Sequence, residues 1–320
     1  MLETFFPRAT PKAKNALRFY DQHYVSIGQW ILQPGHKFVL RSSQPGTCRF
    51  CRLSVPNMTF KMEAHALPEC TGNKSLVTEY ECDPCNQFFG KGIENDFGAW
   101  TKAQRAVSGV KGKKGVPALK EESNNRQWRF EHDATGLKLT HDKGDLIAVV
   151  DEATKQITLT VPCDPYTPIA VLKAFTKMAL SLLPDGEMPN FQEALAWIRN
   201  ANHQADPVRP FAFPVLYTFV PGNNPVETAA LLLRRRSDNL PVPYLTFVLS
   251  YGNEQFQTII PCPQRDAPIG GQKIALPYFP PIIELDSDIQ QVAPVRRDAL
   301  DLTACSVVKG ENMWTVFGYK

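Results

Sequence analysis

Four cysteines in the first third of the sequence have the spacing of a metal site. They form two CxxC pairs, Cys48 with Cys51 and Cys82 with Cys85, and thirty residues separate the pairs. Each CxxC turn brings two sulfur atoms to one side of an ion, so two such turns supply the four thiolates of a tetrahedral zinc site. A plain zinc ribbon has a shorter separation, so we expect the metal to hold the base of a long insert. A thioredoxin-type redox role would need one CxxC in a βαβ context, which this sequence does not suggest.

The insert and the residues just after it carry the polar side chains of a second candidate site. The stretch MTFKMEAH is strand-like and ends at His65, and the loop ALPECTGNKS contains Asn73. LVTEYEC then returns as a second strand, and CNQFFGKGIENDFGAW opens a helix at or near Asn86. Cys70 lies in the loop, and we expect it not to bind the metal. This order predicts a ββα unit that zinc closes.

Taken together, these motifs resemble the HNH endonuclease family. Over residues 47–97 the pattern is CxxC, E-x-H-x-x-P, G-N, CxxC-N and G-x-x-I-E. It is similar to the group with a four-cysteine zinc site and Asn at the last signature position. The resemblance implies that His65 is the general base, that Asn73 orients it and that Asn86 binds a divalent metal. An imidazole titrates near neutral pH and can take a proton from water, and oxygen ligands suit Mg²⁺ or Mn²⁺.

The second ligand of this catalytic metal is open. Many family members have Asp or His directly before the base, where this sequence has Ala64. Glu63 would point to the same side of a regular strand as His65, and a bulge or bend could bring it to the metal. Glu94 follows Asn86 by eight residues and could share a helix face with it. Glu63 and Glu94 are therefore the two candidates.

Three of these residues also have a purely structural interpretation. Asn73 in TGN fits an ordinary turn, and Asn86 fits a helix N-cap. Glu94 fits a solvated helix surface. The sequence leaves these alternatives open.

The sequence predicts an α+β fold with a small zinc-stapled ββα-metal nuclease module followed by a mixed, strand-rich C-terminal region. We place an HNH-like domain at residues 1–100 and a basic linker at 101–124. An α+β accessory domain of unknown role follows at 125–320, with room for a further boundary near residue 205. No P-loop and no GxSxG motif occurs in the accessory region.

Local patterns predict several elements. Residues 1–45 favour short strands or extended arms. Apolar residues at helical spacing after Pro168 predict a helix that Pro184 ends. Residues 244–261 read as two strands joined at Gly252 and Asn253.

Charge is distributed unevenly along the chain. Residues 1–120 hold 17 Lys and Arg against 9 Asp and Glu, whereas the remainder holds 18 basic and 23 acidic residues. This asymmetry favours a polyanion, DNA with RNA left open, as the partner of the N-terminal third. A solvated surface without a partner is the alternative, and a homo-oligomer or a regulatory protein partner is also compatible with the sequence.

Hydropathy excludes a membrane-spanning class. No apolar run is long enough to cross a bilayer, and the first twenty residues lack the apolar stretch of a secretion signal. The expected location is cytoplasmic. The leading function is therefore a metal-dependent endonuclease, and the alternative is a catalytically inactive zinc-dependent nucleic-acid-binding module with a sensor or assembly domain.

The glycine-spaced lysines Lys111, Lys113 and Lys114 give a test of the charge argument, since they either contact phosphates or only solubilise the chain. Replacing all three with Gln should weaken DNA binding and flatten its salt dependence, because each duplex phosphate contact adds about 0.9 to the slope of log K against log salt. Fluorescence anisotropy over a series of salt concentrations measures that slope. Equal binding at low and high salt by the unaltered protein would contradict the prediction.

Overall fold

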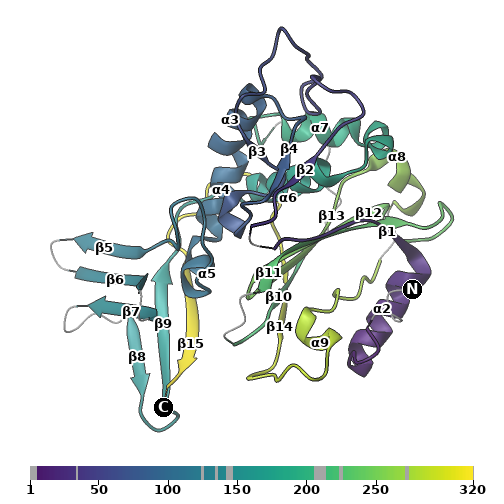
Figure 1. The fold of residues 1–320 in the computed structure, drawn as a ribbon. Coiled ribbons are helices and arrows are strands. Elements are labelled where there is room, and N and C mark those ends of the chain that lie inside the picture. Colours follow the sequence, from purple (N-terminus) through teal and green to yellow (C-terminus); the bar gives the residue numbers. More distant parts are fainter. Residues whose placement is uncertain are drawn as a thin grey trace.

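A six-stranded antiparallel sheet forms the centre of the fold (Figure 1). The computed structural model describes residues 6–33, 35–123, 126–133, 136–141, 147–204, 214–222, 226–270 and 274–319. The sheet has the order β1-β11-β12-β13-β10-β14. Its strands are β1 (Tyr24–Ile31), β11 (Val226–Arg235), β12 (Leu245–Gly252), β13 (Glu254–Ile259), β10 (Val215–Phe219) and β14 (Arg296–Leu300). The first strand of the chain thus pairs with a strand from its C-terminal half.

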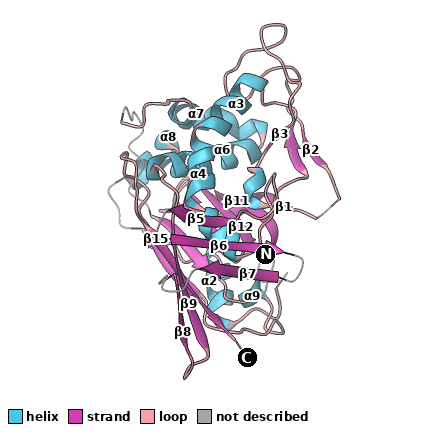
Figure 2. Ribbon diagram, turned by 90° about the vertical axis from the view of Figure 1, so that its left-hand side faces the viewer, coloured by secondary structure: helices cyan, strands magenta, loops and turns pink. Residues whose placement is uncertain are grey.

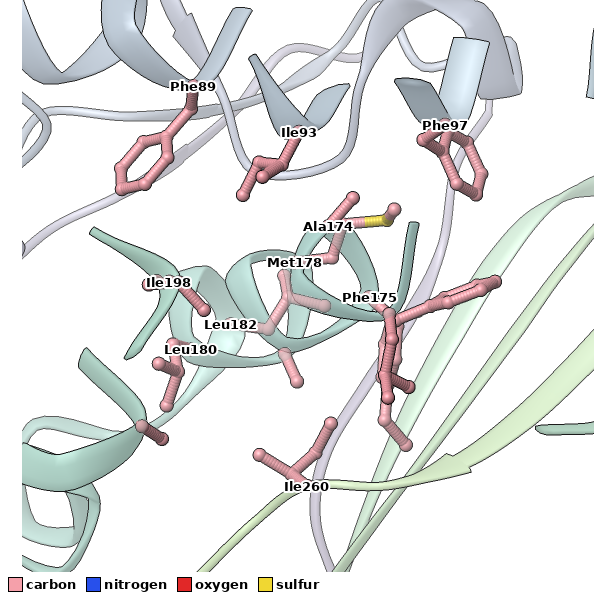
Figure 3. Packing of buried hydrophobic residues seen from close by; sticks show 14 of the residues in the cluster. Phe89, Ile93, Phe97, Ala174, Phe175, Met178, Leu180, Leu182, Ile198 and Ile260 are labelled. Carbon is pink, nitrogen blue, oxygen red and sulfur yellow. The ribbon is translucent and has the colours of Figure 1, made fainter. Parts of the chain in front are cut away.

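The helix α6 (Pro168–Leu182) lies between this sheet and the segment that carries the cysteines. Thr167 is at its N-cap and Pro168 opens it, and every one of its residues is buried. Figure 3 shows Phe89, Ile93 and Phe97 on one side of α6 and Ile260 on the other. Because no face of α6 meets solvent, its position is determined by packing on both sides.

The cysteine-bearing segment forms a ββα unit above α6 (Figure 1). Its small sheet has the order β2-β4-β3, with β2 (Phe38–Leu40), β4 (Leu76–Thr78) and β3 (Ala64–His65). A 3₁₀ turn, η1 (Glu69–Thr71), lies between β3 and β4. The helices α3 (Asp83–Lys91) and α4 (Ile93–Trp100) follow. This order of strand, loop, strand and helix agrees with the expectation, but β3 covers only the last two residues of MTFKMEAH. The helix α3 begins at Asp83 with Cys82 at its N-cap, so Asn86 lies within the helix and is not its N-cap.

The remaining elements cover the sheet and extend beside it (Figure 2). On the opposite face of the sheet, α2 (Pro11–His23) packs with α9 (Ile282–Leu285) nearby. Two three-stranded sheets stand to one side and share a core with α5 (Lys102–Val107). They are β5 (Leu119–Ser123), β6 (Arg126–Asp133) and β7 (Gly136–His141), and β15 (Asn312–Gly318), β9 (Gln156–Pro162) and β8 (Ala148–Asp151). Shorter helical pieces are η2 (Asp185–Phe191), α7 (Gln192–Ile198), α8 (Pro263–Asp266) and η3 (Ala267–Ile269).

The α+β class, the helix after Pro168 and the hairpin at Gly252 are confirmed. The expectation of only strands or extended arms in residues 1–45 is wrong over α2. That helix has an N-cap at Thr10 and buries Ala13, Leu17 and Tyr20 on one face. This is a helical period that the sequence already contained.

The proposed division of the chain into domains remains a prediction, and the structure gives it a new context. The expected linker contains α5 and β5 rather than unstructured chain. One hydrophobic core runs from Phe50 in the cysteine-bearing segment through α6 to Phe256 in the large sheet. Packing therefore continues across the predicted boundaries.

The described residues contain no helix with the length and the apolar character that a bilayer crossing requires.

Candidate active site and zinc site

The four predicted zinc ligands converge. The sulfur atoms of Cys48, Cys51, Cys82 and Cys85 all lie within 4.8 Å of one another. The Sγ atoms of Cys51 and Cys82 are 3.7 Å apart. This is too long for a disulfide but close to the roughly 3.8 Å edge of a tetrahedron with Zn–S bonds of about 2.3 Å.

His65 lies at the end of β3 and lines a cavity of about 660 Å³. Its backbone pairs with Val77 of β4, and its side chain is 16% exposed. Burial lowers the pKa of His65, while the carboxylates of Glu69 and Glu63 act in the opposite direction. A neutral imidazole that still reaches the cavity can accept a proton.

Asn86 and Glu63 meet beside His65. The Asn86 amide donates to the backbone oxygen of Glu63 at 3.4 Å, and Glu63 Oε1 is 3.7 Å from His65 Nε2. Glu63 also pairs with Lys37. Both Glu63 and Asn86 line the same cavity as His65, although Glu63 lies just before β3 and not within it.

Asp83 connects the strand side of this site to α3, and the sequence analysis did not single it out. Its carboxylate accepts hydrogen bonds from the Thr59 hydroxyl and from the backbone N–H groups of Lys61 and Met62. These bonds lower the pKa of Asp83, the hydroxyl of Thr59 first among them. Because Asp83 opens α3, it holds the chain before Glu63 against the helix that carries Asn86.

Asn73 is buried and lies outside the cavity. Its amide nitrogen donates to the carbonyls of Leu67 and Leu76, and its Oδ1 accepts from the N–H groups of Ser75 and Leu76. These four bonds join the loop after His65 to the start of β4. Asn73 can therefore act on His65 only as a positioning residue, through the backbone.

Glu94 is mostly buried rather than at a solvated surface, because it pairs with Lys177 of α6. Lys177 Nζ lies 2.9 Å from Glu94 Oε1 and 3.0 Å from Glu81 Oε2, and it donates to the His65 carbonyl at 3.3 Å. Burial alone would lower the Lys177 pKa, but the two carboxylates outweigh it and raise the pKa. Burial raises the pKa of Glu81 to about 7. The Lys177 amine thus connects β3, the residues just before α3, and α4.

The sequence of α6 already indicates that Lys177 needs a buried partner, although the sequence analysis did not single it out. Lys173 and Lys177 are the two charged residues of α6, and both are fully buried. A lysine within an otherwise apolar helix must find a partner when both sides of the helix are covered. The sequence alone does not say that its partners are Glu81 and Glu94, about a hundred residues away.

Arg49 binds the other end of α6. From its place between Cys48 and Cys51, its guanidinium donates to the carbonyls of Leu180, Ser181 and Leu183. It also pairs with Asp185 at 2.6 Å. The last carbonyls of a helix have no partner within the helix and carry partial negative charge, so Arg49 connects the zinc turn to the C-terminus of α6.

Of the three lysines of the basic segment, one lines the cavity and two do not. Lys113 lines the cavity, and its Nζ lies 3.9 Å from Glu69 Oε2. Lys111 and Lys114 are exposed and do not line it. A phosphate-binding role for all three remains a prediction.

Residues 48–100 match the family model for HNH endonuclease. This part of the chain is an HNH endonuclease domain. The match includes both CxxC pairs, His65 and Asn86, and it ends with the last residue of α4. The comparison with curated proteins and the comparison with solved structures each gave no match. The HNH domain and its cysteine cluster fit the zinc-containing type of this family.

Replacing Cys82 with Ser should remove zinc and lower the melting temperature strongly. Structural zinc contributes an apparent binding energy of about 10–16 kcal/mol, which the small ββα unit needs in order to fold. Elemental analysis and thermal melting measure the two effects, and Cys163→Ser, outside the cluster, is the control. Wild-type protein purified without zinc, or an unchanged melting curve for Cys82→Ser, would contradict the site.

Replacing Lys177 with Met should destabilise the protein by about 3–5 kcal/mol, because it leaves two buried carboxylates without their cation. Urea unfolding gives the magnitude. Lys173→Met is the matched control, since Lys173 is equally buried on α6 but donates to Asn200 instead of the HNH domain. Hydrogen exchange at residues 62–66 and 80–95 should rise in Lys177→Met and not in Lys173→Met. The same exchange pattern in both variants would exclude a specific role for Lys177 in the site.

Proposed function

We propose that this protein is a metal-dependent HNH endonuclease that hydrolyses phosphodiester bonds, in DNA, with His65 as the general base. The observation that carries the proposal is the common cavity of His65, Asn86, Glu63 and Glu94 within a segment that matches the HNH family. The cavity also receives Lys113, whose charge suits a phosphate. The family match supports a nuclease, and the positive charge of the N-terminal third supports a polyanionic substrate, which we propose to be DNA with RNA left open.

The donor set around the cavity fits a hard divalent cation. Glu63, Glu94 and Asn86 offer carboxylate and amide oxygens, which are the ligands that Mg²⁺ and Mn²⁺ prefer. When bound, such a cation would stabilise negative charge on the phosphate and on the leaving oxygen. Asn86 and a carboxylate from Glu63 or Glu94 are the residues that we propose to hold it.

The roles of the chain's own residues follow from their contacts. His65 takes a proton from the attacking water, and its partly buried ring favours the neutral form that can do so. Lys177 holds the His65 carbonyl, and Asn73 holds the loop that follows, so the imidazole enters the cavity from a fixed backbone. Asp83 keeps Glu63 and Asn86 on facing segments.

Replacing His65 with Ala should reduce cleavage of supercoiled plasmid by about 10²–10⁴-fold, the usual contribution of one general base. Zinc content, melting temperature and DNA binding should stay near those of the unaltered protein. His36→Ala is the control, because His36 is an exposed histidine outside the cavity. Equal cleavage by wild type and His65→Ala would refute the mechanism, and no cleavage by the wild type with any divalent metal would favour the non-catalytic binding module.

A further inference from the structure

A second cavity, of about 240 Å³, lies where the large sheet meets β15 and α5. Tyr217, Phe219, Glu254, Arg296 and Trp314 supply its aromatic and charged lining. It is separate from the HNH cavity, since the two share no lining residue. Its position is on the face of the sheet that packs against α6, at the side where β14 forms the edge.

The sheet register places a charged pair across this cavity. Arg296, Phe219 and Glu254 stand directly opposite one another on the neighbouring strands β14, β10 and β13. Glu254 is only 3% exposed and accepts a hydrogen bond from the Tyr217 hydroxyl. That hydrogen bond satisfies Oε2 of the buried carboxyl group, so Oε1 is the oxygen that would accept from a ligand.

Aromatic rings form the mouth of the cavity. Trp314 is 57% exposed, although burying it would be favourable. The Arg296 guanidinium lies 4.9 Å from the Trp314 ring centroid and 5.8 Å from that of Phe219. Arg296 is therefore the cation of this aromatic cluster. Its positive charge would repel a cationic ligand and attract an anionic one.

We propose that this cavity binds a purine nucleotide. The base stacks on Trp314, its N–H groups donate to Glu254, and its phosphate pairs with Arg296. At about 240 Å³ the cavity is smaller than the about 300–1,000 Å³ of typical small-molecule sites, so it has no room for an oligonucleotide and would enclose only part of a single nucleotide. Because the Tyr217 hydroxyl already donates to Oε2 of Glu254, the base would donate to the other carboxylate oxygen, Oε1.

The helix α5 contributes lining residues to both cavities. Gln104 and Val107 of α5 line the second cavity, and Lys102 of the same helix lines the HNH cavity. The segment after α5 lies directly on the β12–β13 turn, because a Cβ on Gly252 would be 2.7 Å from Val110 Cγ2. We therefore expect the nucleotide to alter cleavage, and this second step rests on the proposed nuclease function.

Calorimetry with the full chain and AMP, GMP, ATP and GTP tests the site without any nuclease assay. At least one nucleotide should bind, and Trp314→Ala should raise its Kd by about 5- to 150-fold, the usual effect of removing one stacking ring. Glu254→Gln and Arg296→Ala should also weaken it, whereas the exposed Val316→Ala on the same strand should not. No binding of any of the four, or equal binding by wild type and Trp314→Ala, would overturn the site.

The effect on cleavage has its own readout. Saturating nucleotide should change the plasmid cleavage rate of the wild type by about fivefold or more, the lower range of allosteric coupling, and should leave Trp314→Ala unchanged. An unaltered rate in nucleotide-saturated wild type would overturn the coupling. His65→Ala should still bind the nucleotide, so a failed nuclease assignment and a failed nucleotide site give different results.

Discussion

The structure depends on the charge of one buried amine. The Lys177 side chain is 1% exposed and the carboxylate of Glu81 is fully buried. Neither charge is tolerable without the other, since the cost of removing an ion from water is recovered only by close and well-placed partners. The geometry that satisfies Lys177 also fixes Glu94 and the His65 carbonyl. The position of the proposed general base is thereby tied to the centre of α6.

The cysteine cluster and Arg49 also fix the position of the HNH domain, the first through residues that are near in the sequence and the second through residues that are far away. The four cysteines lie in two turns that are near each other in the sequence, so a metal held by them would organise the ββα unit locally. Arg49 reaches carbonyls more than 130 residues away at the end of α6. The HNH domain thus has two charged contacts to one helix, the ion pairs of Lys177 and the hydrogen bonds from Arg49 to the last carbonyls of α6. An HNH domain of some fifty residues has little core of its own, and α6 provides the surface on which it packs.

The large sheet gives this arrangement a rigid support. One face carries α6 and, through it, the HNH domain, while the other face carries α2. The strand β1 belongs to the sheet although it precedes the HNH domain in the sequence. The chain therefore enters the HNH domain from the sheet and returns to α6 through α5 and the side sheets. A change at the sheet has a short physical route to the HNH cavity through α5.

By itself the sequence determined the features that depend on local spacing. The two CxxC pairs predicted the four-cysteine cluster that the structure shows, because two sulfurs three residues apart can bind one ion. The order of His65, Asn73 and Asn86 identified the HNH unit, and periodicity identified α6 and the β12–β13 hairpin. The helix α2 was missed although its period and cap are local, since basic and aromatic residues obscured the apolar face.

Only the tertiary structure decided which distant groups meet. It buried Asn73 in hydrogen bonds to the loop after His65, moved Glu94 from an expected surface to an ion pair with Lys177, and placed Arg296 and Glu254 on the two sides of Phe219. Each of these depends on long-range packing that no local pattern encodes. The physical reason is that buried charges are satisfied by whichever partner the packed elements place within about 3–4 Å, and that partner is set by topology rather than by sequence spacing.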